Sequence, residues 1–206
     1  MKLSRLVAPV LLVLFFSGCT INAVQHTGLD APASPRDGGS LAVAEAAEGL
    51  NSNRVGWGRF TPFAIPVAPV FVHGDPPVDL MRVVEDALVA AGYNVTRMAE
   101  DAEINSMPML EARFTRYSFN NYTWFAPIVP TWGGIGVTLT LREENGSLLW
   151  RQNFEGRGAT LNFFDGYNSA SNKSVTRMGQ DMVTAFSRDR FYRAMLKANE
   201  AGEDQQ

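Results

Sequence analysis

The chain has 206 residues, of which 18 are basic, 21 are acidic and 46% are hydrophobic. This length suits one domain, and the apolar content is enough for one core. A net acidic chain without a basic stripe argues against a nucleic-acid partner and against electrostatic docking on anionic lipid.

Residues 1–18 have the pattern of a lipoprotein signal peptide. Two positive charges come first, an apolar run occupies residues 6–16, and Ser17 and Gly18 directly precede Cys19. A charged start, a short apolar run and small residues at a cleavage site are typical of secretion. The run is too short to span a bilayer, which takes about 20 apolar residues. The segment before Cys19 resembles a lipobox, which implies that the cysteine sulfur receives a diacylglycerol.

Cys19 is the only cysteine in the chain. No disulfide can therefore form within one molecule, even in an oxidising compartment. The alternative is an ordinary signal peptide cut after Ala23, but this position is a poor match to a small-x-small site. Thr20, rather than an aspartate, follows the cysteine, and by resemblance to enterobacterial sorting rules this favours transfer to the outer membrane. We expect a lipid-anchored domain that faces the periplasm, with the inner membrane and the cell surface left open.

The mature chain divides into three parts. Residues 19–40 are rich in proline and glycine and are expected to form a flexible tether, with a mean reach of about 25 Å. Residues 41–198 form a single domain, and residues 199–206 are a polar tail. Removal of residues 1–18 leaves 16 basic residues against 21 acidic ones, a balance of −5.

The first predicted elements of the domain are a strand and a helix. Residues 60–72 are extended but contain prolines, which indicates an edge or irregular strand. A helix is predicted from Pro76 to Ala91, with Asp75 as its N-cap and Gly92 as the residue that ends it. Apolar residues at helical spacing form its buried stripe: Leu80, Val83, Val84, Ala87, Leu88 and Ala91.

Strands follow at residues 93–98, 110–119, 135–141 and 148–154. The last two alternate apolar and polar residues, and Glu144, Asn145 and Gly146 predict a hairpin turn between them. A second helix is predicted to start near Asn172, with methionines as core filler, and a short helix at 190–197 ends the domain. The predicted fold is α/β of the α+β type. It is a two-layer sandwich of one mostly antiparallel sheet with two main helices packed on one face.

This layout resembles the YajG-like lipoproteins. The resemblance rests on the lipobox, the tether, the helix ending in Ala90-Ala91-Gly92-Tyr93, the meander, and Ala170-Ser171-Asn172-Lys173 before the last helix. It also resembles auxiliary lipoproteins of ABC-type transport systems. The resemblance implies a small α/β envelope lipoprotein, and it transfers no functional residue.

No motif in the sequence predicts a reaction, so we expect no catalytic residues, no metal and no cofactor. His26 lies in the expected tether, and His73 stands alone before the first helix. A catalytic triad and a zinc site both need more partners than these. The acidic pairs, such as Glu85-Asp86, are expected to be solvated. The glycines of 56–58 and 156–158 predict bulges or close backbone approach.

One segment between two predicted strands is aromatic, rich in proline and almost uncharged. Its candidate contact residues are Tyr122, Trp124, Phe125, Ile128, Val129 and Trp132. The segment is either a lid that folds over the sheet or an exposed contact patch with aromatic anchors. We expect a mixed outcome in which Trp132 is buried and Trp124 or Phe125 is exposed.

Three functions remain open from the sequence. The first is a non-catalytic accessory or interaction module of an envelope complex, with an envelope protein as partner. The second is a carrier of an apolar ligand or lipid, which would need a large dry cavity under the aromatic segment. The third, a cell-wall enzyme, would need converging carboxylates near His73. The sequence does not give the oligomeric state.

Overall fold

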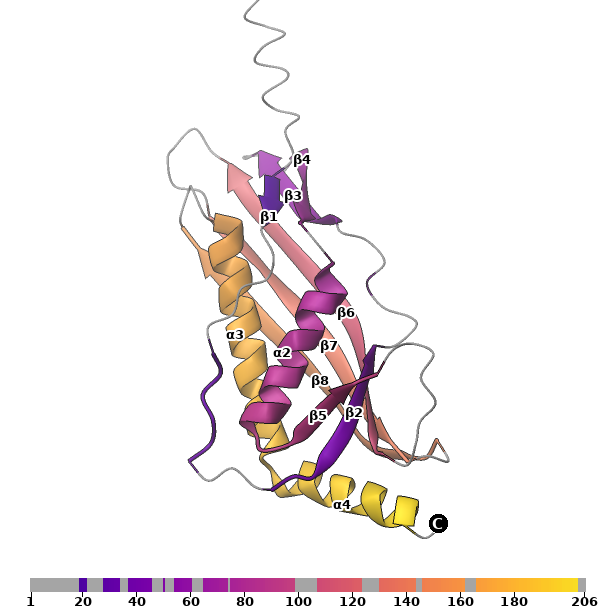
Figure 1. The fold of residues 1–206 in the computed structure, drawn as a ribbon. Coiled ribbons are helices and arrows are strands. Elements are labelled where there is room, and N and C mark those ends of the chain that lie inside the picture. Colours follow the sequence, from indigo (N-terminus) through magenta and orange to yellow (C-terminus); the bar gives the residue numbers. More distant parts are fainter. Residues whose placement is uncertain are drawn as a thin grey trace, which may run out of the picture.

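The protein is described by a computed structural model that covers residues 19–21, 28–33, 37–45, 50, 54–60, 65–73, 75–98, 107–123, 130–143, 146–161 and 166–203. The strands are β1 (Cys19–Ile21), β2 (Ser40–Glu45), β3 (Arg54–Phe60), β4 (Ile65–Val72), β5 (Asn94–Arg97), β6 (Met109–Thr123), β7 (Thr131–Arg142) and β8 (Leu148–Thr160). The helices are α2 (Pro76–Ala90), α3 (Gly166–Phe186) and α4 (Asp189–Glu203). Figure 1 shows their arrangement.

The long strand β6 organises the sheet. On one side, β6 pairs with β7, and β7 with β8, in extended antiparallel ladders. On its other side β6 has two parallel partners at different ends. β2 pairs near its start, where Ala42 meets Met109, and β3 pairs near its end, where Gly56 meets Phe119. The sheet therefore forks at β6 into a β2–β5 arm and a β3–β4–β1 arm (Figure 1).

Helices α2 and α3 lie side by side on one face of this sheet (Figure 1). The described structure is thus a two-layer α/β sandwich with helices on one face, as the sequence predicts. The sheet is mixed, because its long ladders are antiparallel and the joins at β1, β2 and β3 include parallel ones.

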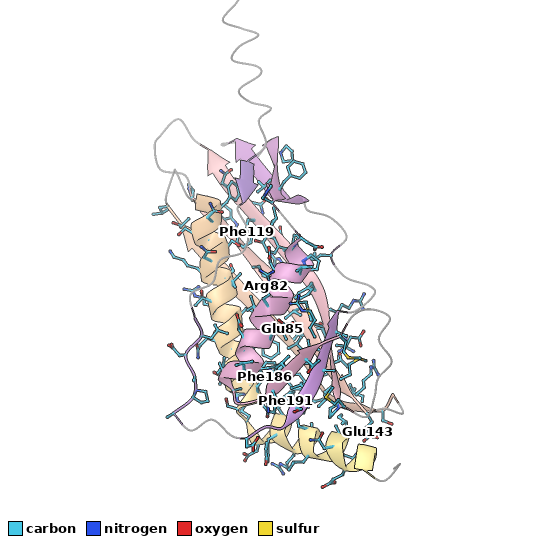
Figure 2. The ribbon with its side chains drawn as sticks, in the orientation of Figure 1. Arg82, Glu85, Phe119, Glu143, Phe186 and Phe191 are labelled. Atoms are coloured by element: carbon cyan, nitrogen blue, oxygen red, sulfur yellow. The ribbon has the colours of Figure 1, made fainter. Side chains whose placement is uncertain are left out.

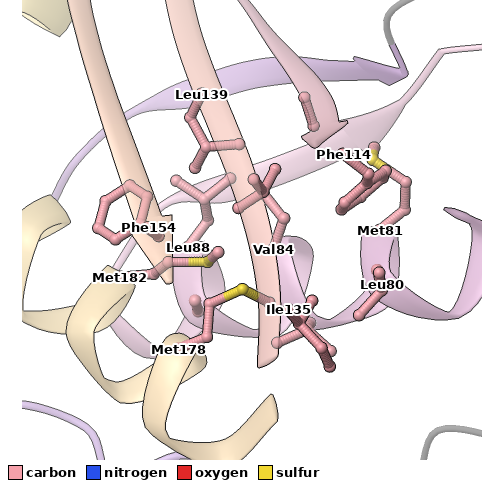
Figure 3. Packing of buried hydrophobic residues seen from close by; sticks show 14 of the residues in the cluster. Leu80, Met81, Val84, Leu88, Phe114, Ile135, Leu139, Phe154, Met178 and Met182 are labelled. Carbon is pink, nitrogen blue, oxygen red and sulfur yellow. The ribbon is translucent and has the colours of Figure 1, made fainter. Parts of the chain in front are cut away.

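The core fills the space between the two layers. Alternate side chains of β7 point toward the helices, and Ile135 and Leu139 are fully buried there. Met178 and Met182 of α3 pack against them with Leu88 of α2 (Figure 3). The methionines are therefore core filler, as predicted, which suits an unbranched side chain that adapts to irregular gaps.

The helix predicted at residues 76–91 is confirmed as α2. All six residues of the predicted stripe are buried, Pro76 and Met81 are buried in addition, and Gly92 adopts a φ of 98°, which ends the helix. One detail differs from the prediction. Asp75 occupies the N-cap position in an extended conformation, but its side chain makes no capping hydrogen bond. The first turn relies instead on Pro76, which has no N–H to satisfy.

Two predicted helix bounds need correction, and two strands of the domain are additional to the predicted ones. Helix α3 starts at Gly166 rather than near Asn172, and α4 continues to Glu203 through most of the predicted polar tail. The predicted strands do not include β2 at Ser40–Glu45. For β3 the sequence predicts bulges or close backbone approach at residues 56–58 but no strand bounds, because Gly56 and Gly58 have low strand propensity. Backbone pairing with β6 stabilises both strands in spite of the low strand propensity of the glycines.

Two glycines of β8 explain how closely this strand packs against helix α3. A Cβ on Gly156 would lie 1.8 Å from the carbonyl oxygen of Ser174, and one on Gly158 would lie 1.8 Å from that of Ala170. Helix α3 therefore packs directly on the backbone of β8. The predicted close backbone approach at 156–158 is confirmed, and β3 contains the predicted register shifts around its glycines.

The segment expected to be a flexible tether contacts the domain wherever the structure describes it at 19–21 and 28–33. Cys19 and its two successors pair with β4. Leu29 packs against the core near Gly179. Asp30 and Gln180 exchange two hydrogen bonds of 3.2 Å, each from a donor N–H to an oxygen of the other residue. At the described residues the chain is therefore held to the domain rather than free, because Leu29 gains burial and the strand gains backbone partners. For the rest of residues 19–40 the flexible tether stays a prediction.

Candidate functional site

The face of the sheet away from α2 and α3 carries the candidate site. Along β7, the odd-numbered side chains from Thr131 to Leu141 face the helices, so the even-numbered ones face away. Trp132 is one of these and is 42% exposed. The expectation that Trp132 is buried is therefore wrong. Its position next to Gly133 suggested a buried strand entry, but strand alternation places it on the open face.

Trp132 stacks on Tyr122 across the β6–β7 ladder. Their ring centroids are 4.5 Å apart and the planes differ by 8°. Trp132 pairs directly with Asn120 in register, so Tyr122 is its diagonal neighbour on the same face. Diagonal pairs in a sheet lie within reach of aromatic side chains. The structure thus brings two of the sequence-predicted contact residues, Tyr122 and Trp132, together in one aromatic stack.

Two further side chains flank this stacked pair. Arg59 of β3 pairs in register with Tyr122, and its Nε donates a hydrogen bond of 3.4 Å to Oδ1 of Asn120. Sequence reasoning missed both residues, because nothing in the sequence places β3 beside β6. The stacked pair thus has an arginine at its border.

A third exposed aromatic lies on the same arm of the sheet. Phe71 of β4 is 36% exposed, whereas its neighbours Val70 and Val72 are buried. It therefore points to the open face, and it pairs in register with Thr20 of β1. The sequence signal for the exposure of Phe71 is its place between Val70 and Val72, since neighbouring side chains of a strand point to opposite faces.

Cys19 belongs to the same end of the sheet. It pairs with Val70, Val70 with Gly56, and Gly56 with Phe119, so the four residues form one row across β1, β4, β3 and β6. Figure 1 shows β1, β3 and β4 together at the upper end of the molecule, and Figure 2 places Phe119 at that end, far from Phe186 and Phe191. Trp132 lies one residue beyond the row.

The other residues of the predicted contact segment, Trp124, Phe125, Ile128 and Val129, lie outside the described residues. Whether they form a lid or a patch is therefore a prediction still. The described part of the candidate surface consists of Tyr122 and Trp132, with Arg59 and Asn120 beside them. We call this surface the aromatic end of the open face. Phe71 lies on the same face but two strands from β6 and one residue behind the row of Cys19.

Away from the aromatic end, the open face is polar. Arg142 and Glu111 form an ion pair with atoms 3.7 Å apart, and Arg157 and Glu155 form one at 3.3 Å. Thr138 donates a hydrogen bond of 2.9 Å to Asn153 across the β7–β8 ladder. The open face is therefore aromatic at Trp132 and carries charged side chains from Arg157, opposite Gly134, onward to Arg142.

The carboxylates considered as catalytic groups are surface ion pairs. Glu85 of α2 pairs with Arg97 of β5, and Glu143 pairs with Lys197 of α4. His73 is exposed. In the described ranges, no group of three or more His, Cys, Asp or Glu side chains could hold a metal ion. No described helix is long and apolar enough to cross a membrane.

One buried polar pair lies in the core. The hydroxyl of Tyr117 lies 2.7 Å from Oγ of Ser171, and burial raises the pKa of Tyr117 to about 12. The phenol is therefore protonated at neutral pH and acts as a hydrogen-bonding group that joins β6 to α3.

Two surface hollows line α3 rather than the aromatic end. One of about 290 Å³ lies between residues 30–32 and the second half of α3. The other, of about 570 Å³, has charged walls that include Glu155, Arg157 and Arg177. Neither hollow is lined by Tyr122 or Trp132.

No protein-family model matches the chain, and no curated protein sequence matches it. Among solved structures, it is similar to a Xanthomonas campestris protein of the family DUF330, with a TM-score of 0.57 and 11% identity over 91% of this chain and 99% of that one. It also aligns with a minor lipoprotein from Acinetobacter baumannii, with a TM-score of 0.40 and 11% identity over 75% and 94% of the two chains. The specific resemblance to YajG stays a prediction. The chain shares its overall fold with the DUF330 protein.

Proposed function

We propose that this protein is an envelope lipoprotein, acylated on Cys19, whose domain is a non-catalytic accessory module of an envelope complex. The observation that carries the proposal is the position of Cys19. Its strand β1 belongs to the sheet whose open face displays the stacked Tyr122 and Trp132. A secretory signal with a lipobox-like end supports export and acylation.

The open face supports a contact function. One face of the sheet is covered by α2 and α3, while the other presents exposed aromatic and charged side chains. Exposed aromatic groups with a polar rim are typical of interaction surfaces. The core between the layers is filled by buried side chains such as Phe114 and Leu139, which favours a contact module over a ligand carrier.

The comparisons add modest support. The Acinetobacter protein is named a minor lipoprotein, which agrees with the proposed class of protein. Anchoring in the outer membrane with the domain in the periplasm remains part of the proposal, because it rests on Thr20 and its resemblance to a sorting signal.

Acylation is tested by growing cells with labelled fatty acid. The wild type should incorporate the label, and Cys19→Ser should not, because serine has no thiol to receive the diacylglycerol. Equal labelling of the two proteins would contradict the lipoprotein assignment.

The accessory role is tested by photocrosslinking in intact cells. A photoreactive residue replaces Arg151 on the open face or, as control, Val89, which is 59% exposed on the helical side. We expect a discrete protein adduct from position 151 and none from position 89. Equal adducts at both positions, or none at either, would count against an interaction module that uses the open face.

A further inference from the structure

The position of Cys19 in the sheet limits how the aromatic end can lie relative to a membrane. Strand β3 and strand β6 continue together for four residues beyond the row of Cys19, from Gly56 and Phe119 to Phe60 and Thr123. At about 3.3 Å per residue, the sheet extends roughly 13 Å past that row. Cys19 is therefore set back from the end of the sheet.

An acylated Cys19 has to reach the hydrocarbon of a bilayer. The polar interface on each side of the hydrocarbon is on the order of 5–8 Å thick. A diacylglycerol attached to Cys19 can cross this layer while β1 stays paired only if the sheet beyond the row lies against or within the interface. The anchor thus brings the aromatic end to the lipid.

The side chains at this end suit that location. Tryptophan and tyrosine concentrate at membrane interfaces, where an apolar ring and a polar atom are both accommodated. Trp132 is 42% exposed, and Tyr122 stacks on it. Arg59, hydrogen-bonded to Asn120, places a positive charge at their border. The charged residues of the open face begin at Arg157 and Glu155, which pair with Gly134 and Gly136, two and four residues along β7 from Trp132.

We propose that the aromatic end of the open face lies in the phospholipid headgroup region, next to the lipid on Cys19. This inference rests on the proposed acylation, and it identifies the partner of the aromatic end as the bilayer itself. The mature chain has a balance of −5, so the contact is aromatic rather than electrostatic. Immersion should be the same in zwitterionic and anionic vesicles and at low and high salt.

The test uses the full acylated protein in phosphatidylcholine vesicles. Acylation blocks the sulfur of Cys19, so a nitroxide can be attached to one introduced cysteine. Leu161→Cys places it just after β8, whose Thr160 pairs with Thr131 beside Trp132. Leu148→Cys, at the other end of β8, is the matched control, because the two leucines are 66% and 56% exposed. Collisions with oxygen and with a water-soluble nickel complex report the depth of each label.

We expect the label at 161 to be shielded from nickel and accessible to oxygen, and the label at 148 to be aqueous. Trp132→Ser should move the label at 161 toward water without changing fatty-acid content or flotation with vesicles. An aqueous label at 161 on a protein that is acylated and floats would overturn the docking and leave the lipoprotein assignment intact. Spin–spin broadening at 161 that persists in detergent would also overturn it, since a second copy would then cover the surface. A chain that takes up no fatty acid would instead contradict the proposed function.

Discussion

The hydroxyl groups of Tyr117 and Ser171 lie 2.7 Å apart and join the centre of β6 to the first half of α3. Both residues are almost fully buried, with exposures of 4% and 1%. Burial makes the charged phenolate unfavourable, and the pKa of Tyr117 rises to about 12. This pair has a consequence for stability at alkaline pH.

We expect stability to fall at alkaline pH. The folded state keeps the proton of Tyr117 up to about pH 12, whereas an unfolded tyrosine loses it near pH 10. The contribution of Tyr117 is therefore complete below about pH 10 and is lost toward pH 12, at about 1.4 kcal/mol per pH unit. Urea unfolding at a series of pH values measures this slope. Tyr117→Phe should show a shallower slope than the wild type, and identical slopes would contradict the assignment.

Leu88→Asp should unfold the domain. Leu88 is fully buried between α2 and the sheet, and an unpaired carboxylate placed there would be costly to desolvate. The control is the next residue, Val89→Asp, because Val89 is 59% exposed. Circular dichroism melts should show a lost transition for the first variant and a near-normal one for the second. A normal melt for Leu88→Asp would mean that the buried face of α2 is assigned incorrectly.

Gly158→Ala should destabilise the packing of α3 on β8. The added methyl group would lie 1.8 Å from the carbonyl oxygen of Ala170, and helix backbone cannot move aside as a flexible side chain can. Overpacking of this kind costs about 1–3 kcal/mol or more. Gly28→Ala is the control, since its Cβ would meet nothing within 4 Å. Chemical denaturation of both variants measures the difference, and equal midpoints would argue against direct contact between β8 and α3.

Trp132→Ser should change stability much less than a core truncation. Trp132 is 42% exposed, so its main loss is the stack on Tyr122, for which aromatic pairs give about 0.5–1.5 kcal/mol. Phe114→Ala, at a position that is 1% exposed, should cost about 3–5 kcal/mol. Thermal melts of the two variants compare these values. A larger loss for Trp132→Ser would show that the ring supports the fold rather than a contact.

The sequence by itself determined the elements whose signals are local. The apolar stripe and Gly92 predict helix α2. Alternation of apolar and polar residues, and a turn in which Gly146 has a φ of 84°, predict the β7–β8 hairpin. These features depend on residues close together in the chain, so periodicity and turn chemistry are sufficient. The alternation in β7 also indicates that Trp132 is exposed, because Ile135 faces the helices and a residue three positions away faces the other side of the sheet.

Tertiary structure decided what depends on residues far apart in the chain. Strands β2 and β3 exist because β6 offers each of them a free edge, and neither has a strong strand pattern of its own. Docking of Cys19–Ile21 on β4 depends on backbone pairing, which side-chain pattern does not encode. The same pairing brings Arg59 beside Tyr122 and sets Cys19 back from the end of the sheet. The candidate surface therefore arises from strand order, since only the assembled sheet brings β1, β3, β6 and β7 to one end.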